Sequence, residues 1–215
     1  MAVESDPHSV APPALRTAIP IRVVRVAFAA LTVAALATIL ASGLESPTFS
    51  VVNFFSYFTV LSNVLAIVVL AVGGLVDPQG RRWQLLRGAV TLYMVITGIV
   101  YAVLLSNIDV GVADGWTNDV VHRIMPIVML IDWIAVPTRH RISEAQTMLW
   151  LAFPLVYGVY TLVRGPIVDW YPYPFLDPRS QGYVALTIGL IVLTVAFGLM
   201  ALAVNAVGRL VRRPD

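Results

Sequence analysis

The chain has 215 residues, of which 59% are hydrophobic and 12% charged, and its mean hydropathy is +0.84. Ordinary soluble domains carry roughly 25% charged residues, so this composition excludes a typical soluble protein and predicts an integral membrane protein. All 14 basic residues are Arg, and they gather in the tails and in two loops between apolar runs. We therefore attribute the basic charge to membrane topology and expect no nucleic-acid partner.

Residues 1–22 contain four prolines and precede the first apolar run, so we expect a disordered cytoplasmic tail. The first run is longer than the apolar core of a signal peptide and is interpreted as an uncleaved anchor. A membrane helix needs about 20 mostly apolar residues, and six runs meet this requirement. They are residues 23–43, 52–76, 86–106, 119–137, 145–163 and 183–207. The sequence thus predicts one all-α, polytopic domain of six transmembrane helices over residues 23–210.

The arginines divide unequally between the two sides of these runs. Only Arg123, Arg164 and Arg179 fall on the side of the first, third and fifth loops. Positive charge favours the cytoplasmic side of a membrane, so both termini are predicted to be cytoplasmic. The other eleven are Arg16, Arg22, Arg25, Arg81, Arg82, Arg87, Arg139, Arg141, Arg209, Arg212 and Arg213.

The longest loop, residues 164–182, is rich in aromatic residues and proline. One interpretation places it at the level of the outer lipid headgroups, where Trp and Tyr are enriched. The other makes it a lid over a site that opens to the outer leaflet.

Polar side chains interrupt the second apolar run. Ser56, Thr59 and Asn63 have the spacing i, i+3, i+7 and would share one face of a helix. Hydroxyl groups in membrane helices often bond their own helix backbone, and Asn often joins helices. The alternative is a functional site, which polar residues inside the membrane also indicate.

His122 is a histidine inside an apolar run and could act as a general base near neutral pH. Asn118 and Asp119 lie one helical turn earlier, where either could orient the ring. The alternative is a histidine anchored at the outer interface by these neighbours. Helical rise places Thr59 and His122 at similar depths in the outer half of the bilayer, so the two side chains can meet.

No metal or other cofactor is expected. The chain has no Cys and three His, of which only His122 lies in an apolar run, whereas a zinc site needs three or four ligands. Asp132 lies too deep to orient His122. We expect it to pair with Arg139 or Arg141, or else to serve in a proton relay.

Three stretches carry a family resemblance: FFSYFTVLSNVL at 54–65, NDVVHRIMPIVMLIDW at 118–133 and WYPYPFLDP at 170–178. They resemble the androgen-induced-gene and FAR-type (AIG/ADTRP-like) membrane proteins and their bacterial six-helix relatives. The resemblance implies an intramembrane hydrolase in the cell membrane, with Thr59 as nucleophile and His122 as its partner. The animal members cleave fatty acid esters of hydroxy fatty acids.

On this hypothesis His122 accepts the Thr59 proton while the hydroxyl oxygen attacks an ester carbonyl, and Asn63 donates to the resulting oxyanion. The expected partner is a membrane lipid or a lipid-like ester. Two rivals stay open, a transporter or channel that uses the polar positions as a path and a non-enzymatic membrane scaffold. The sequence leaves the oligomeric state open.

Overall fold

A computed structural model describes residues 16–106, 115–138 and 140–211, and these residues form helices joined by short loops, with no strand among them. The predicted all-α class is confirmed for this part of the chain. The helices are α1 Ile19–Leu44, α2 Val51–Phe54, α3 Phe58–Leu75, α4 Arg81–Val100, η1 Tyr101–Leu105, α5 Gly115–Asp119, η2 Val120–Ile124, α6 Met125–Ala135, α7 Glu144–Met148, η3 Leu149–Leu151, α8 Ala152–Val168, η4 Pro174–Leu176 and α9 Pro178–Leu210.

Within the described residues, five helices are long and apolar enough to cross a membrane: Ile19–Leu44, Phe58–Leu75, Arg81–Leu105, Glu144–Val168 and Pro178–Leu210. The polytopic class follows from their length and composition. A further helical run from Gly115 to Ala135 corresponds to the fourth expected span. It carries three charged residues, Asp119, Arg123 and Asp132.

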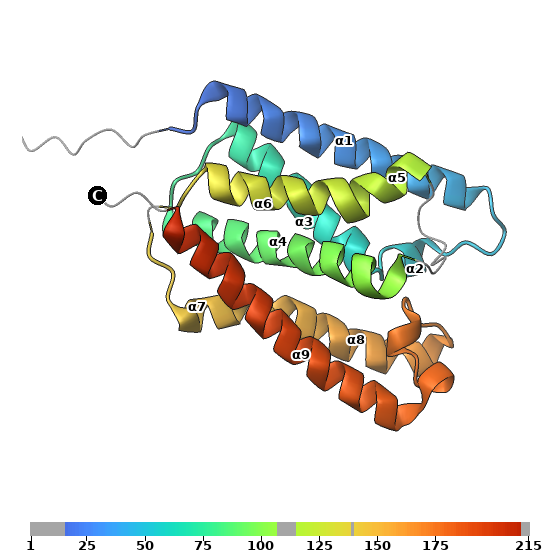
Figure 1. Ribbon diagram of the computed structural model, residues 1–215. Coiled ribbons are helices and arrows are strands. Elements are labelled where there is room, and N and C mark those ends of the chain that lie inside the picture. Colours follow the sequence, from blue (N-terminus) through green and yellow to red (C-terminus); the bar gives the residue numbers. More distant parts are fainter. Residues whose placement is uncertain (1–15, 107–114, 139, 212–215) are drawn as a thin grey trace, which may run out of the picture.

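The helices form two groups (Figure 1). In the first, α1 packs along α3, and α4 lies between α3 and α6. In the second, α8 and α9 lie on the other side of α4, and α9 crosses α4 diagonally. Helix α1 begins and α9 ends at the same end of the molecule, here called the terminal end, whereas α2, α5 and η4 gather at the opposite end.

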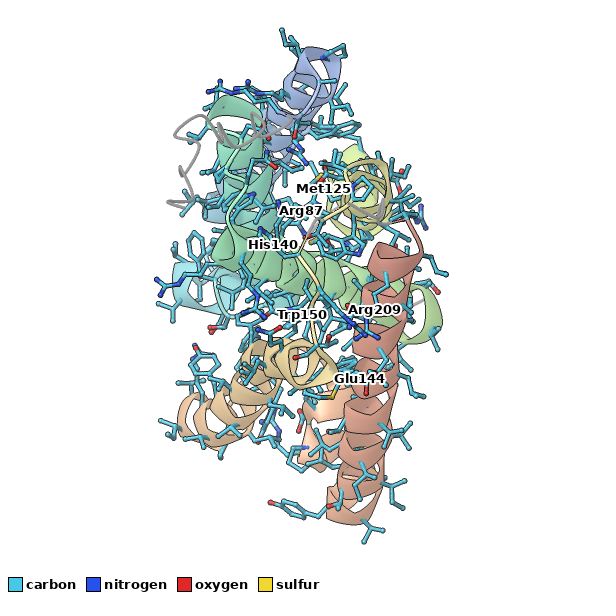
Figure 2. The ribbon with its side chains drawn as sticks, turned by 90° about the vertical axis from the view of Figure 1, so that its left-hand side faces the viewer. Arg87, Met125, His140, Glu144, Trp150 and Arg209 are labelled. Carbon is cyan, nitrogen blue, oxygen red and sulfur yellow. The ribbon has the colours of Figure 1, made fainter. Side chains whose placement is uncertain are left out.

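Close packing of tryptophans on glycines joins the two groups near the terminal end. A Cβ atom on Gly88 of α4 would lie 2.5 Å from the Trp150 ring, and one on Gly208 of α9 would lie 2.8 Å from Trp133. Figure 2 views the terminal end, where Arg209 of α9 approaches Glu144 at the start of α7 with 3.7 Å between the charged groups. Glycine at these positions lets α4 and α9 approach the large rings closely.

The structure corrects two expectations about the helices. Helix α1 begins at Ile19, inside the predicted tail, because Pro20 occupies its first turn, where a missing N–H costs nothing; residues 1–15 of that tail lie outside the described residues. The second run is not one helix. It is divided by extended backbone at Tyr57 (φ −79°, ψ 133°), so that α3 starts at Phe58.

Candidate functional site

The break before α3 places Thr59 in the first turn of a helix. Backbone N–H groups in a first turn have no acceptor inside the helix. Here two tyrosine hydroxyls each accept one of these N–H groups. The Phe58 N–H donates to the Tyr157 hydroxyl over 3.2 Å, and the Thr59 N–H donates to the Tyr173 hydroxyl over 3.3 Å. Tyr157 in turn donates to the Ser56 carbonyl over 2.9 Å. The two tyrosines thus fix the backbone of Ser56, Phe58 and Thr59.

The structure brings Thr59 and His122 together. The Thr59 Oγ1 lies 3.3 Å from His122 Nε2, and both side chains are buried. His122 belongs to η2, a π-helical turn between α5 and α6, and such turns are frequent at functional sites. The distance is long for a hydrogen bond, as it often is in an unliganded catalytic pair. The geometry allows a hydroxyl to pass its proton to a histidine.

The His122 ring is oriented by a second π-helical turn, η1, on the facing helix. Tyr101 stacks on the ring with 4.3 Å between centroids and 20° between planes, and Asn118 donates to the Tyr101 hydroxyl over 2.7 Å. The His122 ring also interacts with the Asn118 backbone, although His122 Nδ1 makes no hydrogen bond within the described residues. A proton on Nδ1 would leave Nε2 free to accept from Thr59. Asn118 therefore acts on the ring through its backbone and through Tyr101.

Asp119 does not contribute to this arrangement. Its carboxylate is ion-paired with Arg123 one turn later, and both side chains are about half exposed. Among the described residues it makes no hydrogen bond to His122. An ion pair in such an exposed setting adds little stability.

Asn63 contributes to the position of the two reacting residues. Its Nδ2 donates to the Thr59 carbonyl over 2.9 Å and to the Val121 carbonyl over 3.1 Å. An amide nitrogen has two hydrogens, so both are engaged with backbone rather than aimed at Thr59 Oγ1. Because Val121 precedes His122, Asn63 joins the backbone of the Thr to the backbone of the His.

Ser56 is separated from this pair by the break in the helix. Its hydroxyl donates to the Val52 carbonyl over 2.7 Å and lies 2.9 Å from the Tyr160 hydroxyl. The polar stripe that continuous helical spacing would produce is therefore divided, with Ser56 on the α8 side and Thr59 and Asn63 toward η2.

An apolar cavity of about 240 Å³ opens beside Thr59, with its walls on α3, α4, α8, η4 and α9. Its far wall on α9 includes Leu193 and Phe197, and Tyr173 lines it next to Thr59. A second cavity of about 450 Å³ reaches His122 from the other side, between α4 and α6. The first cavity can hold an apolar chain with its end at the Thr59 hydroxyl.

The loop expected at residues 164–182 packs over this site. The Tyr173 side chain is only 5% exposed, and its ring stacks on Phe175 with 5.2 Å between centroids. Trp170 packs edge-on to Tyr57 and under the guanidinium of Arg164. The sequence marked this loop as aromatic, but it gave no sign that the Tyr173 hydroxyl would reach Thr59.

A buried ionic network lies outside the Thr59 site and corrects the expectation for Asp132. Its carboxylate accepts from Arg25 over 2.6 and 3.2 Å and from Arg87 over 3.2 Å. Of the two expected partners, Arg141 makes no ion pair with it in the part of the chain that the structure describes, and Arg139 lies outside that part. Asp77 lies 3.8 Å from Arg25 and completes a balanced set of two cations and two anions. The network joins α1, α4 and α6, so its evident role is to hold these helices together.

The described residues contain no cluster of three or more His, Cys, Asp or Glu side chains able to hold a metal ion. Searches against protein-family models, curated proteins and solved structures give no match. The function must therefore be argued from the chemistry of the site.

Proposed function

We propose that the protein is an intramembrane lipid-ester hydrolase related to the androgen-induced-gene and FAR-type proteins, with Thr59 as nucleophile and His122 as general base. In this proposal six helical segments cross the cell membrane and both termini are cytoplasmic. The observation that supports it most directly is the 3.3 Å approach of Thr59 Oγ1 to His122 Nε2 beside an apolar cavity. A hydroxyl paired with an oriented imidazole is the minimal arrangement for nucleophilic catalysis.

The reaction would proceed in two stages. Thr59 Oγ1 attacks the ester carbonyl carbon while its proton moves to His122 Nε2, and the carbonyl electron pair moves to the oxygen. When the tetrahedral intermediate collapses, the alcohol leaves with the proton from His122. Water then attacks the acyl-threonine with His122 as base, which releases the carboxylic acid and restores the Thr59 hydroxyl.

The proposed substrate is a lipid ester with a long acyl chain, such as a fatty acid ester of a hydroxy fatty acid. The apolar cavity would hold the acyl chain, with the ester at Thr59. Helices α8 and α9 expose large apolar side chains such as Val156 and Val192, as lipid-facing helices do. A substrate could therefore enter laterally between these helices without leaving the bilayer.

The test is hydrolysis of long-chain esters by the purified, detergent-solubilised protein and its variants. Thr59→Val removes the nucleophilic hydroxyl but keeps the shape of the side chain, and His122→Ala removes the base. The matched control is Thr32→Val, because Thr32 is a buried threonine on α1 whose hydroxyl bonds its own Phe28 carbonyl. Turnover should be lost in the first two variants and kept in the control. Wild-type rates in a folded Thr59→Val protein would contradict the proposal.

One observation favours a transporter as second candidate: the helix break at Tyr57 resembles the discontinuous helices that form transporter sites. Substrate flux into proteoliposomes that survives Thr59→Val, with no ester turnover in the wild type, would favour this function over hydrolysis.

A further inference from the structure

The Tyr173 hydroxyl lies beside Thr59 but has no role in the reaction of Thr59 and His122 as described above. Its oxygen accepts the Thr59 backbone N–H over 3.3 Å and lies 3.4 Å from Thr59 Oγ1. The residue comes from the loop between α8 and α9, 114 positions along the chain from Thr59. A distant loop thus delivers one polar group directly to the reacting oxygen.

The direction of the hydrogen bonds determines what this group can do. The Tyr173 oxygen accepts from the Thr59 N–H, so its own proton is available for donation. Burial raises the pKa of Tyr173, which keeps the phenol protonated and able to donate. If Thr59 directs its own proton toward His122, the Tyr173 hydroxyl is placed to donate to Oγ1 and to an oxygen bonded next to it.

We propose that Tyr173 is a catalytic residue whose hydroxyl donates to the oxyanion formed when Thr59 attacks an ester. This inference rests on the proposed hydrolase function. In the tetrahedral intermediate the oxyanion is bonded to the same carbon as Oγ1, two bonds away from it. A donor 3.4 Å from Oγ1 on the side of the acyl cavity is therefore within hydrogen-bond reach of that oxygen.

Asn63, the oxyanion donor suggested by the sequence, is less suited to this role. Both of its amide hydrogens are engaged with the carbonyls of Thr59 and Val121, and using one would break the link between the two reacting segments. The link between Tyr173 and the Thr59 N–H uses the phenol oxygen and not its proton, so this link stays intact when Tyr173 donates. A preorganised donor of this kind costs no rearrangement at the moment of reaction.

The test is Tyr173→Phe, which keeps the ring and its packing on Tyr57 and Phe175 and removes only the hydroxyl. Loss of one oxyanion donor lowers kcat by about 10²- to 10³-fold, with KM little changed. A long-chain trifluoromethyl ketone, which forms a tetrahedral adduct, should lose affinity by the same factor as kcat/KM. A purely structural role would not link the inhibitor affinity to the rate.

The matched control is Tyr160→Phe. Tyr160 lies on α8, and its hydroxyl contacts the Ser56 hydroxyl rather than Thr59. Tyr160→Phe should therefore leave both kcat and the affinity for the trifluoromethyl ketone near wild type. Wild-type kcat in Tyr173→Phe, or an equal fall in Tyr160→Phe, would overturn the assignment of Tyr173. A wild-type protein without ester turnover would instead contradict the hydrolase function on which the assignment rests.

If Tyr173→Phe does not fold, a fluorotyrosine at position 173 keeps the hydroxyl and changes its acidity. A donor to the oxyanion makes kcat depend on that acidity. A kcat that is the same for tyrosine and fluorotyrosine would overturn the proposal.

Discussion

Replacing Asp132 by Asn should destabilise the protein strongly. The carboxylate accepts three hydrogen bonds from Arg25 and Arg87, and all three side chains are at most 6% exposed. Removing one partner of a buried ion pair costs about 3–5 kcal/mol, because the other charge stays buried without compensation. At about 2–4 °C per kcal/mol for a protein of this size, the fall in Tm is about 6–20 °C.

Thermal unfolding in a mild detergent measures this change. The matched control is Asp119→Asn, since Asp119 and Arg123 form an exposed pair whose loss should cost less than about 1 kcal/mol. Adding Arg87→Leu to Asp132→Asn should recover part of the lost stability, because it removes a charge that has lost its partner. A Tm for Asp132→Asn as close to wild type as that of Asp119→Asn would refute the reasoning.

Three other changes test the site and its surroundings. Asn63→Ala should lower both turnover and Tm, with about 1–3 kcal/mol lost for the unpaired carbonyls; normal turnover would show that the link to Thr59 is dispensable. Leu193→Trp should fill the cavity and lower kcat/KM for long-chain esters more than for short ones, and an unchanged chain-length profile would contradict an acyl pocket there. Burial raises the pKa of Asp77, but hydrogen bonds from Thr17 and the Arg25 charge outweigh it and hold the pKa below 3.8. The wild-type protein should therefore be more stable than Asp77→Asn by its full margin above pH about 4, and this margin should vanish as the pH falls through the lowered pKa. A margin that persists at lower pH would contradict this sign.

The helices and the approach of Thr59 to His122 could be predicted from the sequence, whereas the other buried contacts between distant segments could not. The apolar runs indicated the helices, since length and composition decide whether a segment can cross a bilayer. Helical rise placed Thr59 and His122 at similar depths, and the structure has them 3.3 Å apart. Their catalytic roles remain a prediction.

Two of the errors concern groups whose partners are far away in sequence. Asp132 lies 107 positions from Arg25, and the apolar pattern around Arg25 gave no sign that it enters the bundle. The break at Tyr57 was missed because no Pro or Gly marks it; the hydroxyls of Tyr157 and Tyr173 stabilise it from another part of the chain. Such contacts depend on how helices pack, which periodicity within one run does not report.

The most direct test of the hydrolase function is to locate a covalent adduct. The wild-type protein would be labelled with a long-chain fluorophosphonate, digested and analysed by mass spectrometry, beside the Thr59→Val and His122→Ala variants. A nucleophilic Thr59 activated by His122 predicts one adduct on Thr59 that is lost in both folded variants. An adduct on a different residue, or labelling that persists without the Thr59 hydroxyl, would contradict the proposed mechanism.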